Sequence, residues 1–305
     1  MIVSSINDVI GNTPMMTFTQ NEYPMPEGSI IYAKLEYLNP GGSVKDRLGI
    51  CLLEIALEKK IIDQSSTIIE PTAGNTGIGL ALAASRYGIK TLFVIPEKFS
   101  IEKQQLMKAL GAEIIHTPTN DGIVGAIQKA KELHTAIPNS YLPSQFENFD
   151  NPLTYYETLG PEIFQDLGPT ITSFVAGIGS GGTFAGVAQY LLEHQENIRI
   201  VGVEPEGSIL NGGPAHGHEI EGIGVEFIPP FFKDLPIHQI FTISDEEGFF
   251  YTRQLAKNNG LLVGSSSGAA FAAALKEVQQ LPPGSTVVTI FPDASDRYLS
   301  KNIYL

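Results

Sequence analysis

A lysine lies where a glycine-containing loop meets a predicted helix, in Asn39-Pro40-Gly41-Gly42-Ser43-Val44-Lys45-Asp46-Arg47. Ser43 is a favourable N-cap, and Asp46 follows three residues later as in a capping box. Apolar residues continue at helical spacing: Ile50, Leu53, Leu57 and Ile61. Lys45 is therefore expected in the first helical turn, where the helix dipole disfavours a cation. A neutral amine is a nucleophile that can form a Schiff base, whereas the alternative is an ordinary solvated lysine.

A first glycine loop, Glu70-Pro71-Thr72-Ala73-Gly74-Asn75-Thr76-Gly77, follows an apolar run and opens a predicted helix. Its small residues let the backbone approach a ligand. Thr72, Asn75 and Thr76 add hydroxyl and amide donors beside a helix N-terminus, which suits a carboxylate. The alternative is a tight strand-to-helix turn capped by Thr or Asn.

A second glycine loop, Gly177-Ile178-Gly179-Ser180-Gly181-Gly182-Thr183, also links a predicted strand to a helix. Its backbone N–H groups and the Ser180 and Thr183 hydroxyls predict a phosphate site. The loop also fits G-x-G-x-x-G, and Glu204 follows at the spacing of a ribose-binding acid. An NAD-dependent dehydrogenase is therefore an alternative, although it leaves Lys45 and the Thr72 loop without a function.

A third polar segment, Gly264-Ser265-Ser266-Ser267-Gly268, precedes an alanine-rich run and is expected to cap a helix. A serine hydroxyl there could also hydrogen-bond a heterocyclic nitrogen without charging it. The six histidines form no ligand pattern, and His216 and His218 are interpreted as solvated loop residues. No metal site is predicted.

Composition restricts the class of protein. The 305 residues include 19 basic and 33 acidic side chains, and the net charge of −14 disfavours nucleic acid and anionic membranes as partners. The single cysteine, Cys51, allows no intrachain disulfide. The N-terminus lacks a basic signal region, and no apolar run reaches membrane-spanning length. We expect a cytoplasmic enzyme.

Short β-branched runs alternate with helical patterns, which predicts an α/β fold with parallel-rich sheets. The expected strands are 29–35, 67–70, 91–95, 173–176, 199–203 and 286–291, and the expected helices are 77–87, 101–110, 123–134 and 183–194. The periodicity breaks at 148–161, which we interpret as the boundary between domains 1–150 and 151–305. The irregular stretch 208–232 is expected to be a functional loop.

Taken together, these motifs resemble the pyridoxal phosphate enzymes of the cysteine synthase and cystathionine β-synthase family. The resemblance extends from IGNTPM through NPGGSVKDRLG, PTAGNTG, GSGGT and EGIG to GSSSGAA. It implies the fold-type II architecture, similar to the tryptophan synthase β subunit: two domains, each a three-layer αβα sandwich with a twisted, parallel-rich sheet. It also implies a homodimer and, in some relatives, a complex with serine acetyltransferase.

The resemblance also implies roles for individual residues. Lys45 would carry the cofactor as a Schiff base and act as the base at the substrate Cα. Asn75 would contact the phenolic oxygen of the cofactor, Ser266 its pyridine nitrogen, and the phosphate would bind Gly179, Ser180, Gly181, Gly182 and Thr183. The substrate carboxylate would bind Thr72, Ala73, Asn75, Thr76 and Gln145.

The implied reaction is β-replacement on O-acetylserine or serine with a thiol acceptor. Sulfide-using cysteine synthases usually have serine at the position of Ala73 and a GIGAGF-like run at Gly222–Phe227. Here Glu221 and Glu226 make this loop similar to that of cystathionine β-synthases. We therefore expect homocysteine as the favoured acceptor, with Gly222 and Glu226 contacting the substrate, and sulfide as the alternative. The NGGPAHGHEI segment is more like that of cysteine synthases.

Overall fold

The computed structural model describes residues 2–72, 74–97, 100–232 and 235–305. The chain forms two compact units. The first contains the residues up to Ile10 together with Asn39–Asp150, and the second contains Gly11–Leu38 and Asn151–Leu305. The division into domains 1–150 and 151–305 stays a prediction.

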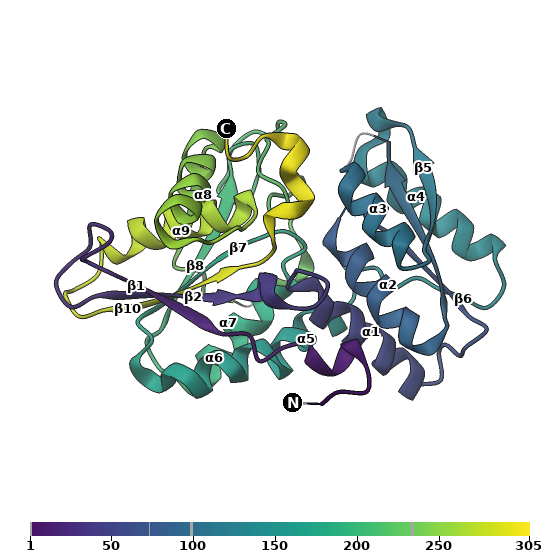
Figure 1. Cartoon of the computed structure of the whole chain (residues 1–305), viewed down its shortest axis with the longest axis horizontal. Helices are drawn as coiled ribbons and strands as arrows, with labels where there is room; N and C mark the ends of the chain where they lie inside the picture. Colours follow the sequence, from purple (N-terminus) through teal and green to yellow (C-terminus); the bar gives the residue numbers. More distant parts are fainter. Residues whose placement is uncertain (1, 73, 98–99, 233–234) are drawn as a thin grey trace. The chain divides into compact units, whose positions relative to one another are not determined.

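The first unit is built on a four-stranded parallel sheet with the order β5-β4-β3-β6. Its strands are β3 (Thr67–Pro71), β4 (Lys90–Pro96), β5 (Glu113–Thr117) and β6 (Ser140–Tyr141). Its helices are α1 (Lys45–Glu58), α2 (Asn75–Tyr87), α3 (Ile101–Ala109) and α4 (Gly122–Ala136). Helix α4 covers one face and α2 and α3 the other (Figure 1). Parallel strands place their carboxyl ends at one edge, where β3 leads into α2.

The second unit contains a six-stranded sheet with the order β1-β2-β10-β7-β8-β9, in which only the β1–β2 pair is antiparallel. Its strands are β1 (Met15–Thr19), β2 (Ile30–Leu35), β7 (Ser173–Gly177), β8 (Arg199–Pro205), β9 (Gln239–Ile243) and β10 (Thr286–Phe291). Its helices are α5 (Asp150–Glu157), α6 (Leu159–Leu167), α7 (Gly182–His194), α8 (Asp245–Asn259) and α9 (Ser265–Val278). Helices α8 and α9 lie on one face of this sheet and α6 and α7 on the other (Figure 1).

The fold class agrees with the prediction: each unit has a parallel-rich sheet between helices. Central strands are apolar on both faces, as parallel strands covered by helices must be. In the second unit, α9 packs its alanines and Phe271 against the sheet, next to Phe18 and Phe291. In the first unit, Ala126 and Ala130 of α4 pack against Ile69 and Val94.

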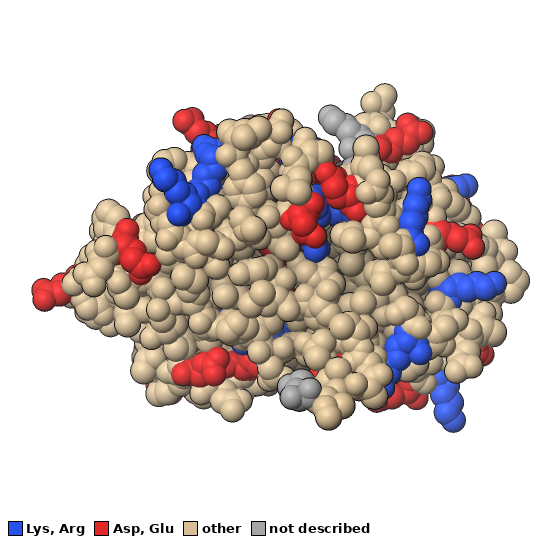
Figure 2. Space-filling model, viewed as in Figure 1, with Lys and Arg blue, Asp and Glu red and all other residues tan. Residues whose placement is uncertain are grey.

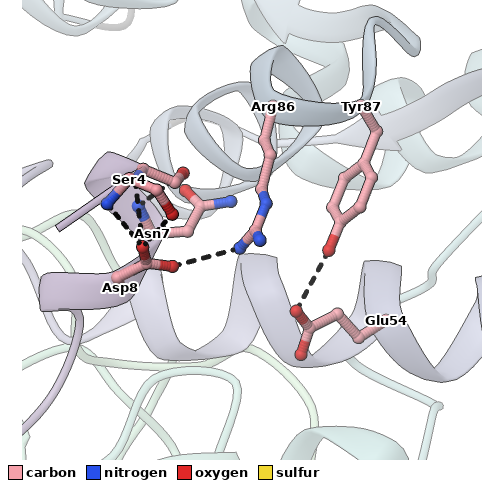
Figure 3. A network of polar contacts seen from close by, with 7 residues as sticks. Ser4, Asn7, Asp8, Glu54, Arg86 and Tyr87 are labelled. Carbon is pink, nitrogen blue, oxygen red and sulfur yellow. Dashed lines mark hydrogen bonds and ion pairs between the residues drawn. The ribbon is translucent and has the colours of Figure 1, made fainter.

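Within the first unit, polar contacts join the N-terminal segment to α2, and α2 to α1 (Figure 3). The carboxylate of Asp8 accepts hydrogen bonds from Ser4 and Ser5 and pairs with Arg86 of α2 at 3.3 Å. The Tyr87 hydroxyl donates to Glu54 of α1 at 3.1 Å. These groups are solvent-accessible, so each contact adds little stability, and the network mainly fixes the course of the chain.

Two predictions about chain course were wrong. Helix α1 ends at Glu58, so Ile61 lies beyond it and is 53% exposed. The stretch 148–161, expected to be irregular, is largely helical in α5 and α6. Pro152 and Pro161 each occupy the third position of a helix, where the backbone N–H has no intrahelical acceptor, so neither ring removes a hydrogen bond.

Surface charge follows the composition. On the face drawn in Figure 2, basic side chains are interspersed with acidic ones rather than gathered into one field. Within the described residues, no helix combines the length and apolar character that crossing a bilayer requires.

Candidate functional site

Lys45 is the first residue of α1, so the predicted position in the first turn is correct. The predicted cap is not. Val44 is the N-cap residue, and the Ser43 hydroxyl accepts from the Lys45 N–H at 3.2 Å. Asp46 does not complete a capping box, because its carboxylate accepts from the Gly41 N–H at 2.6 Å. The carboxylate thereby closes the loop that leads into Lys45.

Two glycines bring α1 against α2. A Cβ on Gly49 would lie 2.2 Å from the carbonyl oxygen of Gly79, and a Cβ on Gly79 would lie 2.3 Å from that of Lys45. Neither distance leaves room for a side chain, so the two helix backbones are in direct contact. This crossing holds the first turn of α1 beside the first turns of α2, which carry Asn75 and Thr76.

The Thr72 loop follows the carboxyl end of β3. Thr72 is buried; its hydroxyl accepts from the Gly74 N–H at 3.2 Å, and its own N–H donates to Val94 at 3.1 Å. Gly74 is the N-cap of α2 and has no side chain, and the N–H groups of a helix N-terminus suit an anion. Ala73, predicted to contact the substrate carboxylate, lies outside the described residues.

Gln145 comes from the segment after β6, yet it reaches α2. The Thr76 hydroxyl donates to its side-chain oxygen at 2.8 Å, and both side chains are buried. Predicted carboxylate-binding residues that are 69 positions apart in sequence are thus in contact. Sequence reasoning did not find what holds this segment: Glu70 accepts from the backbone N–H groups of Ser144 and Gln145.

The Gly179–Thr183 loop connects β7 to α7. Gly181 has a φ of +89°, the left-handed conformation that favours glycine, and forms the N-cap of α7. Asn151, buried beneath the loop, donates to the Ser180 hydroxyl at 3.2 Å. A Cβ on Gly182 would overlap the Asn151 side chain, and one on Gly179 would lie 2.4 Å from the Gly222 carbonyl oxygen. The loop requires these glycines because other parts of the chain pack closely against it.

The Thr183 hydroxyl tests whether this loop suits a phosphate. Its oxygen is buried and has no hydrogen-bond partner among the described residues. An unsatisfied buried hydroxyl is unfavourable by about 1 to 3 kcal/mol, so an anion that accepts from it would remove that penalty. Thr183 also lies in the first turn of α7, where the helix dipole favours negative charge. The loop therefore fits a phosphate group.

Segment 219–225 lies against the phosphate loop, since the Gly224 N–H donates to Ile178 at 2.8 Å. The Asp245 carboxylate accepts from the N–H groups of Glu219 and Ile220 at 2.8 and 3.0 Å. The Glu221 N–H donates to the Ser265 hydroxyl, and its carboxylate lies 3.6 Å from Lys301. Gly222 on this segment and Glu226 just after it, the two predicted substrate contacts, are exposed.

The serine segment lies at the start of a helix and supplies its N-cap, as predicted. Gly264 is the N-cap of α9, and no side chain among the described residues caps that end. Ser266 is instead the second residue of the helix and is 2% exposed. Ser265 is engaged with Glu221, and the Ser267 hydroxyl is fully enclosed without a described partner. The serines therefore have three different environments, and Ser266 remains the candidate for the cofactor nitrogen.

Glu204 does not suit the ribose-binding role that the dehydrogenase alternative requires. It is 1% exposed, and its carboxylate accepts from the Leu210 N–H, the Asn211 N–H and the Thr242 hydroxyl at 2.9, 3.2 and 3.0 Å. These bonds fix the start of the 208–232 loop. A carboxylate so enclosed and so occupied has no oxygen to offer a ribose hydroxyl.

The predicted residues fall into two groups. Lys45, Thr72, Asn75, Thr76 and Gln145 belong to the first unit. The phosphate loop, Gly222, Glu226 and Ser266 belong to the second. Within the described residues, no cluster of three or more His, Cys, Asp or Glu side chains suits a metal ion.

Comparison with known proteins shows which enzymes this chain is similar to. The model of the family described as pyridoxal-phosphate dependent enzyme matches residues 6–293. A relative from Helicobacter pylori strain J99 named cysteine synthase is 68% identical over 304 residues, covering all of both chains. A relative from Bacillus subtilis named O-acetylserine dependent cystathionine beta-synthase is 54% identical and covers 99% of this chain and 98% of its own.

A solved structure is also similar to this chain over its full length. The crystal structure of O-acetylserine dependent cystathionine beta-synthase from Helicobacter pylori is 67% identical in sequence, covers all of both chains and superposes with a TM-score of 0.99. The names of the relatives thus divide between cysteine synthase and cystathionine beta-synthase.

Proposed function

Because the chain belongs to the family of pyridoxal-phosphate dependent enzymes, we propose that it catalyses β-replacement on O-acetylserine, with a thiol as the incoming nucleophile and homocysteine as the favoured acceptor. The protein is an enzyme that uses pyridoxal phosphate, which confirms the predicted cofactor and excludes the NAD-dependent alternative. The proposed donor and acceptor are supported by full-length similarity to relatives, one named cysteine synthase and one named O-acetylserine dependent cystathionine beta-synthase.

The structural observation that carries the proposal is the contact between Thr76 and Gln145 at the carboxyl end of β3. Hydroxyl and amide groups, loop N–H groups and the N-terminus of α2 gather there, a set of donors suited to a carboxylate. An α-amino acid presents that carboxylate next to Cα. In this proposal Thr72, Asn75, Thr76 and Gln145 orient the donor.

The cofactor, when bound, withdraws electrons from the substrate Cα, so that the α-proton and then the β-substituent can leave. We assign Lys45 two tasks: to hold the cofactor covalently through its amine and, once displaced by the substrate, to take the proton from Cα. Gly179–Thr183 hold the phosphate and Asn75 contacts the phenolic oxygen. The crossing at Gly49 and Gly79 supports the assignment of Lys45, because it fixes the start of α1 beside the carboxylate loop.

Ser266 is assigned to the pyridine nitrogen. A neutral hydroxyl can hydrogen-bond that nitrogen without stabilising its protonated form, whereas a carboxylate would favour protonation. By leaving that nitrogen unprotonated, Ser266 would limit how much of the negative charge at Cα the cofactor can delocalise, which would favour prompt loss of the β-substituent over transamination. Burial of Ser266 in the first turn of α9 supports this role, because it limits competing water.

The acceptor depends on the acidic loop 221–226. Homocysteine has an ammonium group that a carboxylate can pair with, whereas sulfide has none. Glu226 is exposed and therefore accessible to an incoming ligand, while Glu221 lies near Lys301. We assign Glu226 the ammonium group of homocysteine. The cysteine synthase alternative is favoured by the name of the 68% identical relative.

Product analysis tests the proposed reaction. The purified enzyme is incubated with O-acetylserine or serine, combined with homocysteine or sulfide, and the products are identified by mass spectrometry. We expect cystathionine from O-acetylserine and homocysteine at the highest kcat/KM. A higher kcat/KM for cysteine formation would favour the alternative, and the absence of both products would refute β-replacement on these donors.

Assembly and location complete the proposal. We propose a cytoplasmic homodimer that can bind serine acetyltransferase. Light scattering at several protein concentrations measures the oligomeric state. Co-purification with the acetyltransferase of the same organism tests the second partner, and a monomeric mass or no co-purification would refute the respective statement.

A further inference from the structure

Glu70 is a buried acid that the proposed chemistry does not use. We propose that it is a positioning residue for the α-carboxylate of the donor, acting by fixing the place of Gln145. This inference rests on the proposed function, in which Gln145 and Thr76 bind that carboxylate. It goes further by naming the group that determines where the Gln145 amide is held.

The sheet brings Glu70 and Gln145 to the same edge. Strands β3 and β6 are parallel, with Thr67 opposite Ser140 and Ile68 opposite Tyr141. Glu70 lies near the end of β3, just before the Thr72 loop, and residues 142–145 leave β6 in the same direction. Two segments that are distant in sequence therefore emerge together next to the N-terminus of α2.

Both oxygens of the Glu70 carboxylate are used. The Ser144 N–H donates to Oε2 at 2.9 Å, and the Gln145 N–H donates to Oε1 at 3.1 Å. The Glu70 side chain has no exposed surface. Hydrogen bonds in a dry environment are stronger than the same bonds in water. The two bonds fix the position and the direction of the backbone that carries the Gln145 side chain.

The backbone at Ser144 has a strained conformation. Its φ is +55°, the left-handed conformation that residues other than glycine, asparagine and aspartate rarely adopt. This conformation is strained for serine, because its Cβ lies too close to the neighbouring backbone. The bond from Glu70 to the Ser144 N–H offsets that strain, so without Glu70 the segment has a reason to relax.

Relaxation at Ser144 would move Gln145. The side-chain oxygen of Gln145 accepts from the Thr76 hydroxyl, which turns the carbonyl end of the amide toward α2. The NH₂ end is the donor end of the amide, which chemically suits an acceptor-only group such as a carboxylate. A change of the backbone at 144 would disturb this orientation at the group proposed to contact the substrate.

The raised pKa of Glu70 agrees with a role in the site and not only in packing. Burial raises the pKa of Glu70 to about 7, against the two backbone hydrogen bonds, which lower it. Strongly perturbed carboxyl groups concentrate at functional sites. A purely apolar contact at this position would avoid the desolvation that the acid incurs, but it could not accept from two backbone N–H groups.

The experiment compares wild type with Glu70→Gln in the cofactor-loaded enzyme. The glutamine amide can accept from one of the two N–H groups and opposes the other with its own N–H. L-Alanine, which has an α-carboxylate but no β-leaving group, is the binding probe in calorimetry. We expect about ten- to thirtyfold weaker L-alanine binding and a similar rise in the KM for O-acetylserine. The kcat should change less than about threefold, with unchanged cofactor content.

Two further variants separate positioning from general damage. Ser144→Gly adopts the left-handed conformation without strain, so adding it to Glu70→Gln should recover at least about threefold of the lost L-alanine affinity. Glu277→Gln is the matched control. Glu277 is also fully buried and accepts from Ser173 and Arg199, at the amino ends of β7 and β8. It should lose stability while keeping the affinity for L-alanine.

The outcomes are decisive. If Glu70→Gln loses stability but binds L-alanine as wild type does, Glu70 has only a structural role and the inference is overturned. Gln145→Ala, measured in parallel, isolates the proposed function: if that variant also binds L-alanine normally, the carboxylate assignment is wrong and the inference fails with it. If Glu70→Gln does not fold, Glu70→Asp replaces it, and unchanged L-alanine affinity in that variant likewise overturns the inference.

Discussion

The carbonyl oxygen of Lys45 lies against Gly79, at a point 2.3 Å from where a Cβ on that glycine would be. Lys45, the residue proposed to hold the cofactor, thus packs with its backbone against a glycine of α2, the helix that starts with Asn75 and Thr76. The contact is between backbones, so no side-chain rearrangement can relieve an added methyl group. The position of Lys45 relative to the carboxylate loop depends on this absence of a side chain.

Gly79→Ala should therefore separate the start of α1 from α2. We expect a loss of about 1 to 3 kcal/mol in the free energy of unfolding, despite the better helix propensity of alanine. The affinity for pyridoxal phosphate should also fall, because Lys45 moves with its helix. Chemical denaturation and cofactor titration measure the two effects.

Gly248→Ala in α8 is the control for Gly79→Ala. A Cβ there meets the far end of the Ile220 side chain at 2.7 Å, which can shift, rather than a backbone atom. It should cost less stability and leave cofactor affinity near wild type. Equal losses in the two variants would show that the α1–α2 contact has no special role.

Thr183→Val should leave the cofactor-free protein at least as stable as wild type, but it should weaken the binding of the cofactor. The substitution removes a buried hydroxyl that has no described partner and keeps its shape, so the cofactor-free protein should be as stable as wild type or more so. The affinity for pyridoxal phosphate should fall by about ten- to a hundredfold if the hydroxyl donates to the phosphate. Thermal unfolding with and without cofactor provides the test. Unchanged affinity would remove Thr183 from the phosphate site.

The raised pKa of Glu70 predicts how stability depends on pH. Burial raises this pKa from 4.5 to about 7, so the folded protein binds the proton more tightly than the unfolded chain does. The contribution of the protonated acid is fully present below pH 4.5 and is lost as the pH rises through about 7. The loss amounts to roughly 3 kcal/mol.

Glu70→Gln lacks this titration, which allows a direct comparison. As the pH rises from 4.5 to 7.5, the free energy of unfolding of wild type should fall relative to that of Glu70→Gln. Burial, with smaller contributions from the charges of Asp150 and Glu70, raises the pKa of Tyr141 to about 12, so Tyr141 stays neutral in this range. A difference that does not depend on pH would refute the raised pKa.

Glu226→Gln tests the choice of acceptor. The change is nearly isosteric and removes a charge proposed to pair with the ammonium group of homocysteine. Cystathionine synthesis should fall by about ten- to a hundredfold, equivalent to roughly 1.5 to 3 kcal/mol, while cysteine synthesis with sulfide should change much less. Parallel assays on one enzyme preparation measure both. If the two activities fall together, or neither moves, Glu226 does not select the acceptor.

The fold was largely predictable because its central strands are continuous apolar runs bounded by turn residues. The expected strands at 67–70, 91–95 and 286–291 fall within β3, β4 and β10. Strands β1, β5, β6 and β9 were missed. They lie at the outer positions of the two sheets, and their residues are largely half-buried or exposed, so the hydrophobic signal is weak.

The candidate site was predictable where one short motif carries it. The Thr72 loop, the Gly179–Thr183 loop and the position of Lys45 follow from local glycine and helix-start patterns. The contacts that hold them did not follow, because they join distant segments: Glu70 with Gln145, and Lys45 with Gly79. Even the cap at Ser43 was misjudged, since Asp46 turns to Gly41 rather than back to the serine.

The proposed function depends on covalent attachment of the cofactor at Lys45. The most direct measurement reduces the purified enzyme with borohydride and locates the cofactor by peptide mass spectrometry, in wild type and in Lys45→Ala. We expect pyridoxyl-modified Lys45 in wild type, with no covalently retained cofactor and no turnover in the variant. Modification of a different lysine, or a Lys45→Ala protein that still retains reducible cofactor and activity, would contradict it.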